Sequence, residues 1–177
     1  FYAQQVLGLE RPRVGLLNIG AEDSKGTDLQ KQTLARLKEA DAAGHLHFIG
    51  NIEAKEAIKG GCDVIVTDGF SGNILLKTME GVGSFAGSAL KSMFKKNLLT
   101  KLAALAVMPG LNAFKDKLDP NKVGGTAFIG ISKAVIKAHG ASNAEAIENA
   151  VGQAAAFARS GLIEKIEENV NLMKIEQ

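Results

Sequence analysis

The chain has 177 residues, enough for one ordinary domain with a substantial core. Its 21 lysines and arginines nearly balance 19 aspartates and glutamates, and 5% of residues are aromatic, which argues against a nucleic-acid-binding protein. The single cysteine, Cys62, lies in an apolar strand pattern, so we expect a core thiol in a reducing cytoplasm and not a catalytic group.

The amino terminus carries no basic segment followed by an apolar run, so we expect no signal peptide. The longest apolar run, Leu102 to Met108, is far shorter than the ~20 residues of a membrane span. Because the chain begins without Met, in what reads as the end of a helix, we expect it to be a fragment of a longer protein.

Apolar runs alternate with helical segments in the first 70 residues. Strands are predicted at Arg13–Gly20, Leu46–Asn51 and Cys62–Asp68. Helices are predicted from Thr27, where Thr27–Gln30 fits a capping box, to Gly44, and within Ile52–Gly61. This alternation predicts a parallel sheet with right-handed crossovers in an open α/β fold.

A long helical region is predicted after Asn73. Its first apolar stripe comprises Val82, Phe85, Ala86, Ala89, Leu90, Met93 and Phe94. Its second stripe comprises Leu98, Leu102, Leu105 and Ala106. On one straight helix the stripes would point in roughly opposite directions, so we predict a break near Asn97–Thr100 and two helices that end at Pro109–Gly110.

Two interpretations of this helical region remain open. Its lysines outnumber Asp116 and Asp119 between residues 91 and 122. These lysines are Lys91, Lys95, Lys96, Lys101, Lys115, Lys117 and Lys122. Either the region is a solvated hairpin whose stripes pack on each other or across a dimer, or it is a basic, apolar element that touches an anionic membrane or an acidic partner. In the second case the later stripe, continued by Met108, Leu111 and Phe114, would be partly exposed.

The last third of the chain predicts two short strands and two helices. The strands are the apolar runs on either side of Gly130 in "TAFIGISKAVIKAHG". Ser142–Glu145 fits a capping box, which predicts an alanine-rich helix to about Ser160, and a last amphipathic helix begins at Leu162.

Three predicted strands end in loops that combine glycine with polar residues: "NIGAEDSKG", "TDGFSGN" and "KAHGASN". In open α/β sheets, ligands bind beyond the carboxyl ends of the strands. Glycines let backbone amides approach an anion, and a following helix N-terminus adds partial positive charge. If the three loops lie on the same edge of one sheet, they predict an anion-binding crevice.

Each loop also has a purely structural interpretation. Lys25 alone fits a solvated loop lysine, and His139 alone fits a capping or turn histidine. Asp68 and Ser71 would simply cap the helix that we expect to start near Asn73.

Motifs for other chemistries are missing from the sequence. His45, His47 and His139 lack zinc-ligand spacing with Cys62. No strand is followed by a dinucleotide-binding glycine motif, and neither a P-loop nor a nucleophile elbow is present. We therefore expect no metal, no cofactor and no covalent catalysis.

Five stretches carry a family resemblance, in the order "VGLLNIGAEDSKG", "FIGNIE", "DVIVTDGFSGNILLKTMEG", "KVGGTAFIG" and "VIKAHGASN". They span most of Arg13–Asn143 and resemble the bacterial phosphate acyltransferases of phospholipid synthesis, the PlsX family. The resemblance implies transfer of a fatty acyl group from acyl carrier protein to inorganic phosphate, which gives acyl phosphate.

The resemblance also implies a fold and a cellular context. The fold is a three-layer α/β/α architecture with a mainly parallel sheet, similar to isocitrate and isopropylmalate dehydrogenases. Residues 1–177 would be the carboxyl-terminal part of a single domain, with a helical protrusion at about 78–118. Members are cytoplasmic homodimers that contact the anionic cytoplasmic membrane peripherally, and they use neither a cofactor nor nucleic acid.

Matching these motifs residue by residue gives the candidate site. The catalytic candidates are Lys25, Asn73 and His139. The substrate-binding candidates are Gly20, Asp68, Gly69, Ser71, Gly72, Lys77, Lys137 and Gly140. Backbone amides after Gly69 and Gly72, the Asn73 amide and a lysine would orient phosphate and stabilise an oxyanion.

Two other functions stay open at this point. One is a phosphotransacetylase-like enzyme that uses acyl-coenzyme A. The other is a non-catalytic membrane-binding or protein-binding module built around residues 82–118.

Overall fold

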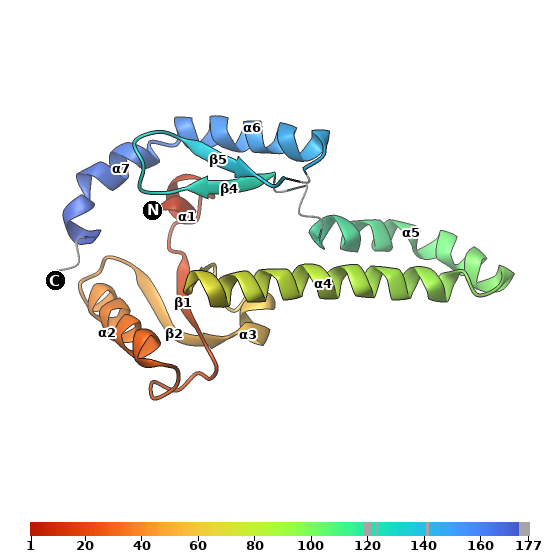
Figure 1. Cartoon of the computed structure of the whole chain (residues 1–177), viewed down its shortest axis with the longest axis horizontal. Helices are drawn as coiled ribbons and strands as arrows, with labels where there is room; N and C mark the ends of the chain where they lie inside the picture. The colour runs from red at the N-terminus through yellow and green to blue at the C-terminus, as the bar shows by residue number, and fades with distance from the viewer. Residues whose placement is uncertain (119–121, 123, 141, 174–177) are drawn as a thin grey trace. The chain divides into compact units, whose positions relative to one another are not determined.

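The computed structural model describes residues 1–118, 122, 124–140 and 142–173. The chain forms two compact units (Figure 1), and the following paragraphs take each by itself. The first unit combines Phe1–Asn73 with Ser160–Gln177, and the second comprises Ile74–Arg159. The second unit is therefore larger than the predicted helical protrusion at about 78–118. That residues 1–177 belong to a single domain stays a prediction.

The first unit is built on a parallel three-stranded sheet with the strand order β2-β1-β3. Its strands are β1 (Arg13–Asn18), β2 (His47–Glu53) and β3 (Val64–Val66). Its helices are α1 (Tyr2–Gln5), α2 (Asp28–Ala42), α3 (Ala54–Ile58), α7 (Leu162–Glu168) and the 3₁₀ helix η2 (Val170–Met173). The predicted α/β fold with a parallel sheet is confirmed.

Strand β1 is the central strand of the sheet, and its residues 14 to 16 are buried. Val14 and Leu16 are buried, and alternation along the strand turns Gly15 to the opposite face. There a Cβ on Gly15 would lie only 2.8 Å from Cγ2 of Ile52, which forms a buried cluster with Ala57 and Cys62. The α3 side of the core is therefore packed closely enough to require glycine at this position.

An arginine–aspartate pair joins the start of β1 to the start of β3. The Arg13 guanidinium donates to both carboxylate oxygens of Asp63, at 2.9 and 3.0 Å, and the Arg13 amide donates to the same carboxylate at 2.8 Å. Hydrogen bonds from Arg13 lower the pKa of Asp63 to about 2. Arg13 also donates to the carbonyl oxygens of Gly60 and Gly61, so one side chain fixes the turn before β3.

The second unit contains most of a long helix, α4 (Gly69–Phe94), followed by α5 (Leu98–Leu118). The amides of Asn97 and Thr100 each donate to the other residue's side chain, at 3.1 and 2.8 Å. The Thr100 hydroxyl also donates to the carbonyl oxygen of Phe94 at 3.1 Å. The predicted break near Asn97–Thr100 is confirmed, and these bonds cap the two helix ends that meet there.

Helix α5 does not end where the sequence predicts. It continues through Pro109 to Leu118, so the predicted end at Pro109–Gly110 is wrong. Proline removes one hydrogen bond from a helix but leaves the bonds of the neighbouring turns in place. The side chains of Lys115 and Lys117, and residue Asp119, lie outside the described residues.

In the single chain, the two predicted apolar stripes are largely exposed to solvent. Helix α4 contains no buried residue, and Phe85 of its first stripe is 75% exposed, so the single chain does not bury this stripe. The second stripe is exposed as predicted at Leu98, Leu102 and Leu105. Burial of the first stripe across a dimer stays a prediction. Among the described helices, none is long and apolar enough to cross a bilayer.

The rest of the second unit is a β-hairpin covered by a helix (Figure 1). Strands β4 (Gly125–Phe128) and β5 (Val135–Ala138) pair antiparallel, and α6 (Ala144–Arg159) contacts both. The two predicted strands are confirmed, but they form a sheet of their own among the described residues. The connection of 129–134 is too short for the crossover that a parallel pair needs, ~12 residues.

Helix α6 begins one residue later than the predicted capping box implies. Asn143 precedes the helix, and its side-chain oxygen accepts a hydrogen bond from the Ala146 amide at 2.9 Å. Asn143, and not Ser142, is therefore the N-cap. Glu145 instead forms an ion pair with Lys122 at 2.6 Å.

Candidate functional site

The loop after β1 is folded back against the strand end by Asn18. The Ile19 amide donates to the Asn18 side chain at 2.8 Å, and that side chain donates to the Lys25 carbonyl oxygen at 3.2 Å. Gly26 closes the loop with φ +90°, and a Cβ there would lie 2.8 Å from Oδ1 of Asn18. The residue must therefore be glycine, both for its backbone conformation and for the close approach.

Lys25 is held at this carboxyl edge of the sheet by its stem. Gly20 is buried, and a Cβ on it would lie 2.7 Å from Oε2 of Glu22 and 3.0 Å from Cγ of Lys25, so both side chains cover the glycine. The Glu22 carbonyl accepts from the Lys25 amide at 3.1 Å and from the Asn51 side chain at 3.0 Å, which ties the loop to β2. No carboxylate among the described residues pairs with the Lys25 ammonium group, so its charge is available to a ligand.

The loop after β3 is short and leads directly into α4. The Asp68 carboxylate accepts a hydrogen bond from the Ser71 amide at 2.8 Å, and the Asp68 carbonyl accepts from the Gly72 amide at 3.0 Å. Hydrogen bonds from Ser71 hold the pKa of Asp68 below its usual value. Asp68 is therefore the N-cap of a helix that starts at Gly69, and the predicted start near Asn73 is too late.

This cap changes the role that the sequence assigned to the backbone amides. The amides of Ser71 and Gly72 are already engaged by Asp68, whose carboxylate occupies the positive end of the helix dipole. A bound anion at that position would have to replace the carboxylate. The structural interpretation of Asp68 as a cap is confirmed, while Asn73, in the first turns of the helix, keeps an exposed side chain.

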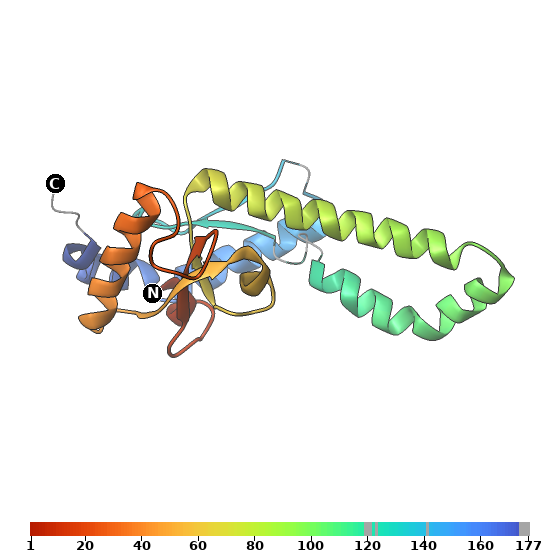
Figure 2. The same cartoon turned by 90° about the horizontal axis from the view of Figure 1, so that it is seen from below.

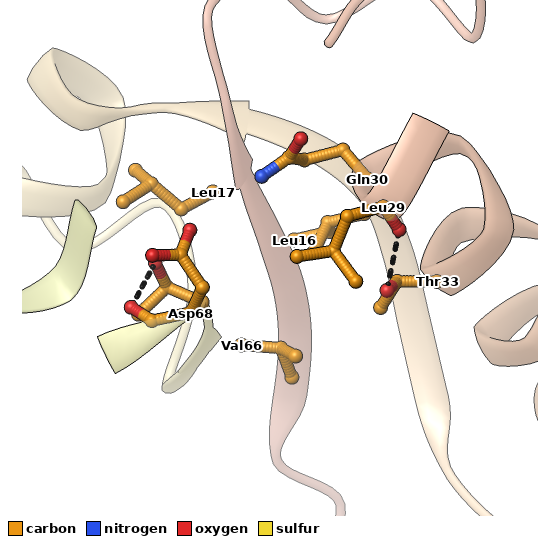
Figure 3. Close-up of a pocket in the computed structure, with 8 residues that line it drawn as sticks. Leu16, Leu17, Leu29, Gln30, Thr33, Val66 and Asp68 are labelled. Carbon is orange, nitrogen blue, oxygen red and sulfur yellow. Dashed lines mark hydrogen bonds between the residues drawn. The ribbon is translucent and has the colours of Figure 1, made fainter. Parts of the chain in front are cut away.

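A small pocket lies beside this helix start in the first unit (Figure 3). It has a volume of about 220 Å³. Its walls are Leu16, Leu17, Leu29, Gln30, Thr33, Val66, Thr67 and Asp68, from β1, α2 and the β3 end. Of the predicted site residues, only Asp68 lines it. Its mixed walls and its carboxylate make it a poor pocket for an isolated anion.

The parallel sheet brings part of the predicted site together. Gly20 and Lys25 follow β1, while Asp68, Gly69, Ser71, Gly72 and Asn73 follow β3. Since β1 and β3 are hydrogen-bonded neighbours running in the same direction, both groups lie at the same edge of one sheet. Two of the three predicted loops therefore share an edge.

The remaining candidates belong to the second unit. Lys77 forms an ion pair with Glu80 at 2.7 Å, one turn along α4. Lys137 lies on β5 opposite Thr126, and His139 and Gly140 follow that strand, where the His139 carbonyl accepts from the Ser142 amide. The expectation that all three loops follow strands of one sheet is wrong, because β5 belongs to the hairpin.

Sequence reasoning missed the two asparagines that organise the lysine loop, Asn18 and Asn51. Asn51 is buried, and its Oδ1 has no hydrogen-bond partner among the described residues. The signal was present in "LLNIG" and "FIGNIE", where a single amide interrupts an apolar run, at the end of β1 and within β2. A lone buried amide there is more costly than a solvated one, so it points to a structural or ligand-binding role.

Cys62 is a buried core residue, as predicted. Burial raises the pKa of its thiol, which keeps it protonated and unreactive at neutral pH. Within the part of the chain that the structure describes, no group of three His, Cys, Asp or Glu side chains is arranged to hold a metal ion.

Comparison with known proteins identifies the family. The family model described as "Fatty acid synthesis protein" matches residues 1–165. The chain belongs to this family. Among its curated relatives, the protein named phosphate acyltransferase from Brevibacillus brevis is 46% identical over 169 residues, 96% of this chain and 49% of the relative. Those of the same name from Anoxybacillus flavithermus and Thermoanaerobacter pseudethanolicus are 43% and 45% identical, covering 98% and 97% of this chain and 51% of each relative. The chain thus spans about half the length of the curated relatives it matches, and the resemblance seen in its sequence motifs is confirmed.

Proposed function

We propose that the full-length protein is a phosphate acyltransferase that transfers a fatty acyl group from acyl carrier protein to inorganic phosphate, for membrane phospholipid synthesis. The observation that carries the proposal is the match over nearly the whole chain to relatives named phosphate acyltransferase. It is supported by the ammonium group of Lys25, which no described carboxylate pairs, and by an exposed Asn73, at adjacent strand ends of the parallel sheet.

The chemistry needs few protein groups. A phosphate oxygen attacks the thioester carbonyl carbon, a C–O bond forms, the C–S bond breaks, and the carrier thiol leaves with a proton. The protein must hold the anion beside the thioester and stabilise the tetrahedral oxyanion. In this proposal the Lys25 ammonium neutralises phosphate and the Asn73 amide donates to the oxyanion. His139, Lys77, Lys137, Gly20 and Gly140 remain candidates by the resemblance.

The Asp68 cap adds one requirement to this mechanism. Because its carboxylate engages the first amides of α4, phosphate is bound chiefly by side chains and not by the helix end. Asp68, Gly69, Ser71 and Gly72 then act by shaping the strand-to-helix turn that presents Asn73. In this version of the site they position the donor and do not bind the anion.

The assembly and location belong to the same proposal. We infer a homodimer with the three-layer fold of isocitrate and isopropylmalate dehydrogenases, associated peripherally with the cytoplasmic membrane. The exposed leucines of α5 and the neighbouring Lys95, Lys96 and Lys101 favour such a contact with anionic lipid.

The test is an Asn73→Ala variant of the full-length protein, assayed for acyl phosphate formation. Losing one oxyanion donor lowers kcat by ~10²–10³, so we expect at least a hundredfold loss with an unchanged unfolding temperature. Asn171→Ala, an exposed amide in η2, is the matched control and should keep full activity. A fall of less than threefold for Asn73→Ala contradicts the assigned role.

Comparing acyl donors separates the alternatives. Preference for the acyl-carrier thioester supports the proposal, while preference for acyl-coenzyme A favours a phosphotransacetylase-like enzyme. If the full-length protein forms no acyl phosphate from either donor, the remaining alternative is a non-catalytic binding module.

A further inference from the structure

The stretch "FIGNIE" contributes no candidate to the proposed site, although it forms most of β2 beside the central strand. The loop between β1 and α2, orange-red in Figures 1 and 2, carries Lys25 and begins where β1 ends. Residues 21–25 of this loop are exposed. Contacts with the sheet must therefore hold the lysine in place.

A bulge in β2 turns Asn51 toward the α2 face of the sheet. The pairing of β1 with β2 shifts by one residue between Val14 and Leu16, and Leu16 pairs with Asn51. Gly50, just before it, has φ +92°, a conformation that other residues rarely adopt. Leu16 faces α2, because it lines a pocket with Thr33 of that helix. Paired residues share a face, so Asn51 faces α2 as well, whereas a strand without the bulge would turn it to the opposite face.

Asn51 is joined to Lys25 through one carbonyl oxygen. The Glu22 carbonyl accepts from the Asn51 side chain at 3.0 Å and from the Lys25 amide at 3.1 Å. The Lys25 carbonyl in turn accepts from the Asn18 side chain at 3.2 Å. Both backbone polar groups of Lys25 are therefore fixed, one by Asn18 directly and the other through a carbonyl that Asn51 holds.

Stability alone does not explain an amide at this position. Asn51 is 8% exposed and is the only buried polar side chain among the residues that the structure describes. Its Oδ1 has no hydrogen-bond partner among them, and an unsatisfied buried acceptor is costly. A leucine has a similar size and would avoid this cost. What the amide adds is its hold on the loop.

We propose that Asn51 is a positioning residue for Lys25, which it keeps at the carboxyl edge of the sheet through the Glu22 carbonyl. The inference rests on the proposed function in taking Lys25 as the cation that binds phosphate. Asn51 itself is too buried to touch the substrate. Replacing it should therefore weaken the binding of phosphate and leave the acyl donor unaffected.

The first experiment follows hydrogen exchange in the full-length protein and needs no activity. Asn51→Leu removes the hydrogen bond to the Glu22 carbonyl, so exchange across residues 20–26 should be about fivefold faster, the effect of losing one hydrogen bond. Exchange in β1 should be unchanged, and the unfolding temperature should not fall. A substitution that merely weakened the core would speed exchange in β1 as well. Unchanged exchange across residues 20–26 overturns the proposal.

The second experiment measures the KM for inorganic phosphate and for the acyl donor. Asn51→Leu should raise the phosphate KM about tenfold and leave that of the donor within about twofold, because only the lysine is displaced. In a Lys25→Ala background, Asn51→Leu should change the phosphate KM by less than about twofold, because it acts through the lysine. Independent, multiplicative effects of the two substitutions overturn the proposal.

A matched pair of glycines tests the bulge without removing the amide. Gly50→Ala strains the bulge and should raise the phosphate KM, as Asn51→Leu does. Gly44, just after α2, has φ +77°, and a Cβ on either glycine would meet nothing within 4 Å. Gly44→Ala therefore carries a similar strain and should leave the phosphate KM unchanged. Equal changes from the two variants would assign the effect to strain in general and overturn the proposal.

The two proposals fail separately. A phosphate KM that Lys25→Ala leaves unchanged contradicts the role of Lys25 in the proposed function, and hydrogen exchange then decides alone whether Asn51 holds the loop. A phosphate KM that Lys25→Ala raises and Asn51→Leu does not contradicts only the role of Asn51.

Discussion

In the sheet unit Leu16 is 2% exposed, whereas on α5 Leu102 is 56% exposed. The two regions have similar apolar residues but use them differently. Leu16 of β1 and Leu34 of α2 are buried in the sheet unit, while the leucines of α5 at positions 98, 102 and 105 are largely exposed. The sheet unit is therefore the part of the chain where burial supplies stability.

Glycine shows the same division. Gly15 and Gly72 lie under neighbouring side chains, with 2.8 Å and 2.6 Å between a hypothetical Cβ and the nearest atom. Gly81 and Gly87 on α4 have nothing within 4 Å of theirs. Gly15 and Gly72 therefore permit close packing in the sheet unit, whereas Gly81 and Gly87 leave open space further along α4.

The largest expected effect comes from truncating matched leucines in the two regions. Leu16→Ala should lower the free energy of unfolding by ~2–5 kcal/mol, because it leaves a cavity in the core. Leu102→Ala should change it by less than ~0.5 kcal/mol, because the side chain is already largely solvated. Urea denaturation of both variants measures the two changes. Equal losses would show that the helical pair is as tightly packed as the sheet.

A smaller effect, of opposite sign in the two regions, is expected from adding one methyl group. Gly15→Ala should lower the free energy of unfolding by ~1–3 kcal/mol, since the β-branched Ile52 cannot easily move away. Gly81→Ala should raise it by up to ~1 kcal/mol, because alanine is the better helix former and has room. Thermal unfolding of both variants tests the sign. Stabilisation by Gly15→Ala would contradict the close packing on the α3 side of the sheet.

The smallest effect concerns the pair that joins β1 to β3. The folded state lowers the pKa of Asp63 to about 2, so its stabilising contribution is fully present above pH ~4 and is lost as the pH falls through about 2. Asp63→Asn should therefore be less stable than the unmodified chain at pH 7, and the difference should narrow between pH 4 and pH 2. Glu80→Gln, which removes an exposed pair on α4, should change stability little. A difference for Asp63→Asn that is constant from pH 7 to pH 2 would mean that the carboxylate is not the stabilising species.

Local patterns predicted the elements well where one physical rule decides them. The apolar runs gave β1, β2 and β3, and the phase of the two stripes gave the break between α4 and α5. The direction of β5 was predictable as well, because the six residues 129–134 cannot contain a crossover. The early start of α4 was harder to foresee, since it depends on Asp68 capping a first turn that contains two glycines.

The sequence predicted which site residues lie together only where those residues follow neighbouring strands of one sheet. Motifs placed Lys25 and Asn73 at strand ends, and pairing of β1 with β3 puts those ends together. For His139 the sequence shows a strand end but not which sheet the strand joins, and that membership depends on tertiary pairing.

The first unit is made of two segments that the ribosome synthesises at different times. The first unit combines Ser160–Gln177 with Phe1–Asn73, yet all of Ile74–Arg159 is translated in between. At ~5–20 residues per second, the sheet emerges from the ribosome on the order of ten seconds before α7, which carries the fully buried Leu162. During that interval the second unit can fold as one continuous segment, while the first waits with an incomplete surface. Newborn chains should therefore depend most on chaperones after the sheet has emerged and before its last helix is made.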